Sequence, residues 1–279
     1  MDAVEYFAGR AAVTRALQAI GFQAVPYDVS YAMNGQNILS DKGFALALQL
    51  ALRLKWGGFC MLAPVCSSWV WMSRAATKRS AAEPMGDTTV RCVAEGNLML
   101  ARVVLLLKLL HAKHVVWVLE QPSSSLWEKT SAMQQLMTEM NIYKKFLWMG
   151  NYGGASPKPT CLYSNAACVQ ELAGESLDRS KFTKQTGMTR RYRDTHGAQR
   201  VSGDKNLKES QHYPEAFGHA IAAWYAQQRN ARLQEAHTLK ASHDAAVQAN
   251  QKAWMSCWQA SPDAISSEAG MASVIAYLK

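Results

Sequence analysis

The sequence predicts an α/β fold in which a doubly wound, mostly parallel sheet is covered by helices on both faces. Two observations predict this fold. Short apolar runs, typical of strands, alternate with longer segments of helical periodicity through the first 120 residues. The runs are also apolar at nearly every position, as strands are when helices bury both faces of a parallel sheet.

Each element is bounded by a recognisable stop. Gly21 and the pair Gly57-Gly58 follow two of the expected helices, and glycine just past a periodic segment is a usual helix end. In chain order we expect a strand at Ala3–Phe7, a helix at Ala11–Ile20, a strand at Gln23–Tyr27, a helix at Phe44–Leu54, a strand at Phe59–Ala63, a helix at Val90–Ala112 and a strand at Val115–Leu119.

The composition is that of an ordinary globular chain with an unusual charge. The 279 residues are 49% hydrophobic, so the chain can bury a core without disulfides or a structural metal. Lys and Arg number 30 against 21 Asp and Glu, and the net charge of +9 favours a polyanionic partner. The longest apolar stretch, Leu98–Leu110, contains Arg102 and Lys108 and is too short to cross a bilayer, so we expect no membrane association.

The cysteines indicate a reduced, intracellular protein, with nucleus and cytoplasm not distinguished. Six cysteines are spread along the chain without a CxxC pair, and the N-terminal residues lack the pattern of a secretory signal. Cys161, Cys168 and His196 make a poor zinc site because a fourth ligand is missing. We therefore expect no metal.

Four expected strands end in residues suited to chemistry, namely Gly9, Asp28, Cys66 and Glu120. Ligands of open α/β sheets bind outside the carboxyl ends of the strands. Because these ends meet at one edge of a parallel sheet, we expect the four residues to form one candidate site.

The first two strand ends favour a nucleoside cofactor. A small-residue turn at Ala8-Gly9 lets a ligand approach the backbone, and Asp28, 19 residues after Gly9, suits a ribose diol. The turn reads FAGRAA rather than GxGxxG, which disfavours a pyrophosphate and hence NAD. S-adenosyl-L-methionine fits better. The alternative is a plain turn followed by a solvated strand end.

The other two strand ends favour covalent catalysis. Cys66 lies in a loop after a buried strand, in a partly exposed place of the kind that activates a thiol. Three basic residues follow it closely, namely Arg74, Lys78 and Arg79. Glu120 follows an apolar strand, where a carboxylate is costly to bury without a partner. The alternatives are a small apolar residue for Cys66 and a salt-bridged strand end for Glu120.

Five stretches, in the same order, resemble motifs of the cytosine-C5 methyltransferases. VEYFAGRAAVTRALQAIGFQAVPYD is similar to the first two motifs, APVCSSW to the Pro-Cys motif and LEQP to the Glu-Asn-Val motif. MGNYGGASPKPTCLYSN resembles the segment with Gln-x-Arg-x-Arg, and ESQHYPEAFGHAIAAWY resembles the closing motif. Together they cover Ala3 to Tyr225.

The resemblance implies a Rossmann-like methyltransferase domain over residues 1–225, with S-adenosyl-L-methionine as cofactor. The Ala- and Gln-rich residues 226–279 are expected to form a helical extension or a tail. In the family, Cys66 would be the nucleophile, Glu120 would contact N3 of the target base, and Lys158 would stabilise O2 or a neighbouring phosphate. The cofactor would contact Phe7, Ala8, Gly9, Asp28 and Pro64. The implied partner is DNA, with the target base flipped out of the stack.

Four departures from the family pattern leave alternatives open. Val65 separates Pro64 from Cys66, and Gln121-Pro122 replaces Asn-Val. The turn FAGRAA lacks further glycines, and Lys158 and Thr160 stand where the family has arginines. These changes suit a divergent DNA enzyme, an RNA cytosine-C5 methyltransferase, or an inactive nucleic-acid-binding protein of the same fold.

Most of the excess charge lies in the segment Asp178–Lys208, which we expect to be a loop and a reduced target-recognition segment. It holds nine Lys and Arg against three Asp, an excess of six within the total of nine. Aromatic residues are interleaved, a composition that suits phosphate contact with some stacking. The residues expected to bind nucleic acid are Arg190, Arg191, Arg193 and Arg200. The alternative is a solvated basic loop.

Overall fold

The computed structural model describes residues 1–31, 35–178, 180, 182, 189–193, 195, 197, 199–203 and 211–260. The chain divides into two compact units, Met1–Ala226 and Gln227–Lys279. The first unit contains the main sheet and the candidate site. The described part of the second unit is helical as far as Ala260.

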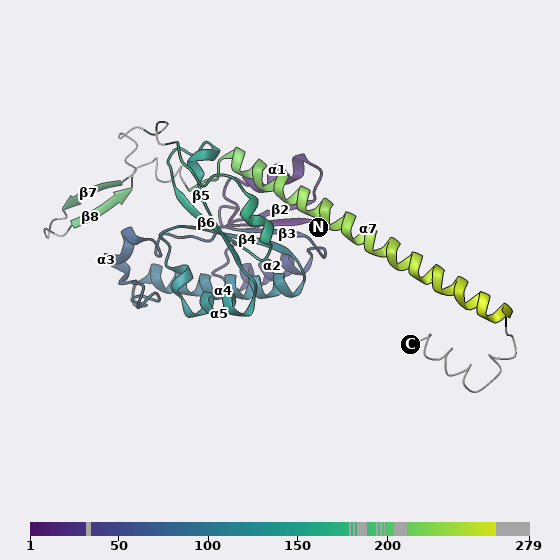
Figure 1. The fold of residues 1–279 in the computed structure, drawn as a ribbon. Helices are drawn as coiled ribbons and strands as arrows, with labels where there is room; N and C mark the ends of the chain where they lie inside the picture. Colours follow the sequence, from purple (N-terminus) through teal and green to yellow (C-terminus); the bar gives the residue numbers. More distant parts are fainter. Residues whose placement is uncertain are drawn as a thin grey trace. The chain divides into compact units, whose positions relative to one another are not determined.

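Figure 1 shows the elements, and their bounds are as follows. The strands are β1 Ala3–Tyr6, β2 Ala24–Tyr27, β3 Phe59–Leu62, β4 Val116–Pro122, β5 Tyr143–Trp148, β6 Pro159–Ser164, β7 Thr189–Arg193 and β8 Gln199–Gly203. The α-helices are α1 Ala12–Ala19, α2 Asp41–Leu52, α3 Arg74–Thr77, α4 Arg91–Ala112, α5 Ser131–Glu139 and α7 Glu215–Ala260. Short 3-10 helices cover Trp71–Ser73, Trp127–Lys129, Met149–Tyr152 and Ala167–Glu171.

One sheet of six strands, in the order β2-β1-β3-β4-β6-β5, organises the first unit. Strands β1 to β4 run parallel to one another, whereas β6 runs antiparallel to both β4 and β5. The α/β prediction is confirmed, as are the four expected strands and three expected helices, with ends shifted by a few residues. The mixed, mostly parallel sheet is compatible with a Rossmann-like fold.

Helices cover both faces of the sheet, as Figure 1 shows. On one face, α2, α4 and α5 pack against alternate strand residues such as Val4 and Tyr6 of β1. On the other face, α1 and the first turns of α7 pack against residues that include Ala3. Gly218 of α7 lies so close to α1 that an added Cβ would stand 2.5 Å from the carbonyl oxygen of Ala12. The glycine therefore permits this close helix contact.

The ends of the strands follow simple chemistry. Pro26 has no amide hydrogen to donate, and it lies in β2, which is at the edge of the sheet. The strand predicted to stop before Glu120 continues to Pro122, because its second half pairs with β6 after its pairing with β3 has ended. Glu120 thus lies inside β4, one residue beyond the end of β3. The prediction that it follows the strand is wrong by this margin.

The basic segment is not a plain loop. Strands β7 and β8 pair antiparallel, with Arg191 opposite Val201 and Tyr192 opposite Arg200. The prediction of a loop is therefore wrong for these residues, because their backbones pair as two antiparallel strands. Most of the remaining positions of the segment, including Arg179, Lys181 and Lys205, lie outside the described residues.

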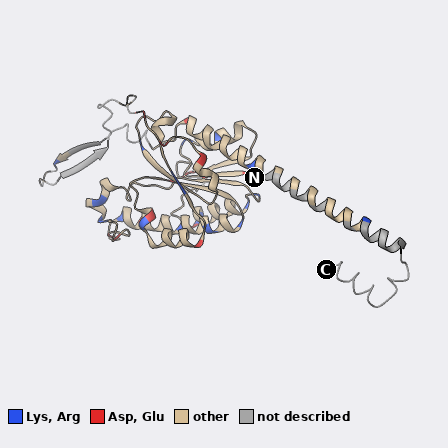
Figure 2. Cartoon of the chain, viewed as in Figure 1, with Lys and Arg blue, Asp and Glu red and all other residues tan. Residues whose placement is uncertain are grey.

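Charged residues lie mostly on helices and connections, while the strands of the six-stranded sheet are mostly uncharged (Figure 2). The helix begun at Glu215 runs without a break to Ala260, so its first turns belong to the first unit and the rest to the second. Within the described part of the chain, every helix is too short or too polar to cross a membrane.

Candidate active site

The residues predicted from the sequence are placed at one edge of the sheet. Gly9, Asp28 and Cys66 follow the carboxyl ends of β1, β2 and β3. Glu120 lies near the carboxyl end of β4, and Lys158 directly precedes β6, whose reversed direction puts its start at the same edge. Five chain segments therefore contribute to one candidate site.

The turn after β1 is tied to the end of β2 by hydrogen bonds. The amide of Gly9 donates to Oδ2 of Asp28 at 2.9 Å, and the hydroxyl of Tyr31 donates to the Gly9 carbonyl at 2.8 Å. The turn has three residues of positive φ, Phe7 at 61°, Gly9 at 52° and Ala11 at 54°. This left-handed backbone costs most for residues with a Cβ, so the tie to Asp28 helps to hold it.

The carboxylate of Asp28 already accepts three hydrogen bonds from the chain itself. Its Oδ1 accepts from the amide and the hydroxyl of Ser30 at 2.8 and 2.6 Å, while Oδ2 accepts from Gly9. A carboxylate has about four acceptor sites. A ribose diol would therefore compete with, or displace, one of these internal bonds.

Glu5 is a site residue that the sequence reasoning missed. It lies in β1 with only 2% of its surface exposed, and Oε2 accepts from the amide and the hydroxyl of Thr14 at 2.7 and 2.6 Å. Oε1 is buried without a hydrogen-bond partner among the described residues. Burial raises the pKa of Glu5, although the bonds from Thr14 oppose this. The available signal was an acid inside the apolar run AVEYF.

Cys66 is half-buried at the start of the loop after β3, next to two opposite charges. Burial first, and then the carboxylate of Glu120, raise the pKa of its thiol to about 11, while the ammonium of Lys158 acts in the opposite direction. The expectation of an electropositive surrounding made by Arg74, Lys78 and Arg79 is therefore wrong. The groups that act on the thiol come from β4 and from the segment before β6.

Arg79 is instead the anchor of the loop. It is buried, and its guanidinium stacks on Trp69 with Cζ 3.4 Å from the ring centre. It donates to the carbonyl oxygens of Pro84 and Val93 at 2.6 and 3.2 Å. Burial lowers its pKa to about 10. Trp69 thus belongs to the core, while Trp71 and Met72 of the same loop are exposed.

Gln121 fixes the start of the same loop. Its side chain is buried and donates from Nε2 to the carbonyl oxygen of Pro64 at 2.8 Å, while Oε1 accepts from the hydroxyl of Ser125 at 2.8 Å. Pro64 lies two residues before Cys66. The residue next to Glu120 therefore positions the loop that carries the candidate nucleophile, a role that a single sequence does not reveal.

Glu120 and Lys158 form a partly buried ion pair beside Tyr213. The Lys158 ammonium lies 3.4 Å from Oε1 of Glu120 and 5.8 Å from the ring centre of Tyr213. The hydroxyl of Tyr213 is buried next to the carboxylate of Glu120. Burial, followed by the carboxylates of Glu120 and Glu5, raises the pKa of Tyr213 well above its ordinary value. Tyr213 lies in the segment before α7, which therefore also reaches the site.

The remaining predicted residues have more modest settings. Phe7 is half-buried, and Ala8 is buried with its amide donating to the carbonyl of Tyr27 at 3.1 Å. Arg190, Arg191 and Arg193 lie on β7, and Arg200 lies on β8. Of these four side chains only that of Arg193 is described, and it is exposed. The described residues contain no group of three or more His, Cys, Asp or Glu placed to hold a metal ion.

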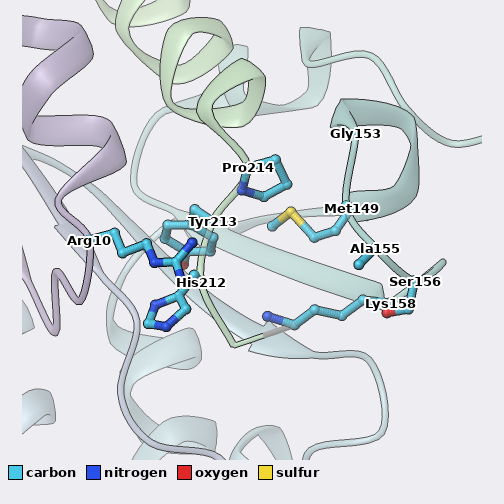
Figure 3. A pocket seen from close by; sticks show the side chains of 10 residues that line it. Arg10, Met149, Gly153, Ala155, Ser156, Lys158, His212, Tyr213 and Pro214 are labelled. Carbon is cyan, nitrogen blue, oxygen red and sulfur yellow. The ribbon is translucent and has the colours of Figure 1, made fainter. Parts of the chain in front are cut away.

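A pocket of about 160 Å³ opens beside the ion pair (Figure 3). Its lining comes from the turn after β1, the connection between β5 and β6, and the segment before α7. It adjoins Lys158 and Tyr213, so it belongs to the same edge of the sheet.

Comparisons with known proteins assign no family to this chain. No protein-family model matches it, and no curated protein is significantly similar to it.

Proposed function

We propose that the protein is an S-adenosyl-L-methionine-dependent methyltransferase that transfers a methyl group to carbon 5 of cytosine in DNA through a covalent adduct with Cys66. One observation carries the proposal: Cys66, Glu120 and Lys158, which come from three separate segments, meet at one edge of the sheet. The two charged groups lie 3.4 Å apart, and both act on the thiol. A nucleophile next to a proton-transfer group is the usual arrangement for covalent catalysis.

Residues at the β1 and β2 ends fit the proposed cofactor. The unpartnered Oε1 of Glu5 is a buried acceptor suited to the ammonium group of a methionine moiety. Asp28 lies at the end of β2, where a ribose would exchange with its bonds to Ser30. Phe7, Ala8 and Gly9 would line the turn, and Pro64 would face it from the β3 loop. When bound, S-adenosyl-L-methionine supplies a methyl group on a sulfonium.

The residues account for the proton and electron balance of the reaction. Because the pKa of the thiol is about 11, Cys66 must lose its proton to a neighbour, and the adjacent Glu120 carboxylate is suited to take it. As sulfur bonds to carbon 6 of cytosine, Glu120 passes this proton to N3, and carbon 5 becomes nucleophilic. Carbon 5 then takes the methyl group, and the electrons of the broken sulfur–methyl bond stay on the cofactor sulfur, which leaves as a neutral thioether. Loss of the carbon 5 proton to solvent expels the Cys66 thiolate. The N3 proton would return through Glu120 to this thiolate, which restores the ring and the thiol. Lys158 would hold O2 of the base.

DNA is the proposed partner because of the +9 charge and the arginines of β7 and β8. RNA cytosine would serve the same chemistry. A catalytically inactive nucleic-acid-binding protein is the alternative from a different class. The raised pKa of Cys66 and the internal bonds of Asp28 favour that alternative.

The test is adduct formation with oligonucleotides that contain 5-fluorocytosine, offered as DNA and as RNA with S-adenosyl-L-methionine. Fluorine at carbon 5 prevents the final elimination, so an active enzyme is trapped as a complex that survives denaturation. We expect the complex with DNA, its loss in Cys66→Ser, and its retention in Cys92→Ser, which removes an exposed cysteine. If the complex forms with RNA and not with DNA, the substrate is RNA. Absence of adduct and of cofactor binding would overturn the enzyme proposal.

A further inference from the structure

The connection from β3 to α4 is long and carries an exposed tryptophan. It covers residues 63–90, whereas a typical connection has about 4–6 residues, and long connections are often functional. The indole of Trp71 is 58% exposed, at the start of a 3-10 helix that leads into α3 (Figure 1). Trp69, two residues earlier, is fully buried. The proposed reaction gives no role to the exposed indole.

The exposure of Trp71 does not result from a loosely held loop. The amide of Leu126 donates to the carbonyl oxygen of Trp69 at 3.1 Å, which ties the loop to the segment after β4. The hydroxyl of Ser73 donates to the carbonyl oxygen of Val70 at 2.8 Å. Trp71 is therefore held between two fixed positions, while its side chain makes no ring contact or hydrogen bond with a described residue.

Two further apolar side chains of the same loop are exposed. Val65 is 54% exposed and Met72 is 46% exposed. Val65 directly precedes Cys66, and Trp71 follows Cys66 by five residues, which span at most about 18 Å. These apolar side chains therefore lie within a few nucleotides of the thiol that is proposed to attack the target base.

A cation without a partner lies one helical turn from the exposed indole. Arg74 follows Trp71 by three residues, a spacing that places two side chains on the same side of a helix. Its Nε is buried without a hydrogen-bond partner, and no described residue forms an ion pair with it. By contrast, Arg79 is enclosed in the core, and Lys78 acts on the carboxylate of Asp87. Arg74 is therefore the cation of this loop that an outside anion can use.

The charge of the loop favours an anionic ligand with an aromatic part. The stretch from Val65 to Ala82 contains three cations and no acid. An exposed aromatic ring next to a cation is the arrangement with which proteins bind unpaired nucleotides, because the base stacks on the ring and the cation attracts the phosphate. The unpartnered guanidinium distinguishes this surface from a purely apolar patch that a second copy of the chain would cover.

We propose that Trp71 and Arg74 bind one unpaired nucleotide of a DNA strand, with the base stacked on the indole and the phosphate paired with the guanidinium. Met72 and Val65 extend the apolar contact. The inference rests on the proposed function for the kind of partner, a nucleic acid, and it does not require methyl transfer. Because every base has a π-face, binding at this surface should not depend on the base sequence.

The first experiment separates base stacking from phosphate contact. Fluorescence anisotropy at low salt gives the affinity of the full chain for a short single DNA strand and for an abasic strand of the same length, which keeps the phosphates and lacks the bases. In Trp71→Leu we expect about tenfold weaker binding of the strand with bases and unchanged binding of the abasic strand. Trp71→Phe keeps an aromatic ring and should retain most of the affinity.

The matched control for the indole is Trp56→Leu. It removes a tryptophan that is 76% exposed in the connection between α2 and β3, away from the Cys66 loop. We expect the affinities of this variant for both strands to equal those of the unmodified protein.

The second experiment tests the cation. Arg74→Gln should weaken the binding of both strands by the same factor. It should also reduce the slope of log affinity against log salt concentration by about 0.7, the value for one phosphate contact to a single strand. The control Arg53→Gln, which removes an exposed cation just after α2, should leave this slope unchanged.

Four outcomes would overturn the proposal. The unmodified protein could bind neither strand, or Trp71→Leu could bind the strand with bases as tightly as the unmodified protein. An equal loss on the abasic strand would show that the indole does not act by stacking. A changed oligomeric state of Trp71→Leu, measured by light scattering, would assign the exposed patch to a second copy of the chain. Circular dichroism and the thermal midpoint show whether each variant is folded.

Failure of this inference and failure of the methyltransferase proposal can be told apart, because strand binding is measured without S-adenosyl-L-methionine. Binding that depends on Trp71, in a protein that forms no adduct with 5-fluorocytosine, would support the inference and overturn only the enzyme proposal. Normal adduct formation by Trp71→Leu, at unchanged strand affinity, would overturn only the inference.

Discussion

Two strand-end loops that meet at the candidate site are held in different ways. The loop after β3, which carries Cys66, is long and is fixed by side chains, with Arg79 buried under Trp69 and Gln121 bonded to Pro64. The turn after β1 is short and is held mainly through its backbone. Every second residue from Phe7 to Ala11 has a positive φ, and the backbone of Gly9 bonds to Asp28 and Tyr31.

This difference indicates a division of tasks. The loop that carries Cys66 is held by buried side chains that also pack in the core. Substitutions in this loop should therefore lower the stability of the whole unit. The turn at β1 depends on the absence of a side chain at Gly9, so changes there act locally on whatever binds at the turn. Three substitution experiments test this distinction.

The largest effect is expected from Arg79→Met, which keeps the aliphatic volume and removes the guanidinium. The carbonyl oxygens of Pro84 and Val93 would lose buried donors, and Trp69 would lose its cation. We expect the free energy of unfolding to fall by about 2–4 kcal/mol, measured by urea denaturation. In the control Arg91→Met, an exposed ion pair with Glu95 is lost and the unfolding midpoint should barely move. Equal effects in both variants would show that the loop is not anchored through Arg79.

A smaller effect is expected from Gly9→Ala, with Gly21→Ala as the matched control. Both glycines have positive φ, 52° and 90°, so each alanine should cost about 1–2 kcal/mol of stability in denaturation. The two positions differ in the space around an added methyl group. A Cβ at Gly9 would lie 3.3 Å from Nδ1 of His212, whereas nothing lies within 4 Å of a Cβ at Gly21. We therefore expect loss of S-adenosyl-L-methionine affinity in Gly9→Ala alone, measured by calorimetry. The same affinity loss in both variants would contradict a local role for the β1 turn.

The smallest effect is a shift in the pH profile of Cys66. Its pKa is raised to about 11, and only the thiolate reacts with iodoacetamide, so alkylation at Cys66 should keep rising as the pH approaches 11. Removing the negative charge with Glu120→Gln should move the midpoint down, and removing the positive charge with Lys158→Gln should move it up. Mass spectrometry of the Cys66 peptide gives the profile, with the exposed Cys92 as internal reference. If neither substitution changed the pH midpoint of Cys66 alkylation, the ion pair would have no electrostatic effect on the thiol.

The sequence predicted those parts of the fold that depend on local pattern. The strands β1 to β4 are short apolar runs buried on both faces, and this pattern is readable without a partner. Strand β5, YKKFLW, was missed because Lys144 and Lys145 interrupt its apolar character, and the edge of the sheet allows Lys144 to reach Glu128 instead of lying in the core. Its neighbour β6 was missed because it is identified by pairing with β5 rather than by its own pattern.

The sequence predicted only those site residues whose position follows from the end of a strand. Gly9 and Asp28 come together because parallel strands place their carboxyl ends side by side. The contribution of Glu5, Arg79 and Tyr213 depends on tertiary contacts with Thr14, Val93 and Glu120, and one sequence carries no information on such pairs. Burial explains why the charge near Cys66 was misjudged, because proximity in sequence to Arg79 says nothing about where a guanidinium is enclosed.

The reversed direction of β6 has a consequence for how this protein could change over time. The connection from β5 to β6 lies at the edge where the candidate site is built, and it ends in Lys158. Both of its ends are fixed by a sheet register that does not depend on its length. Insertions or deletions between Trp148 and Lys158 would therefore change the surface that faces the ligand, while the four parallel strands keep their order. This connection is thus the place where ligand specificity can be altered, by evolution or by design, without changing the sheet.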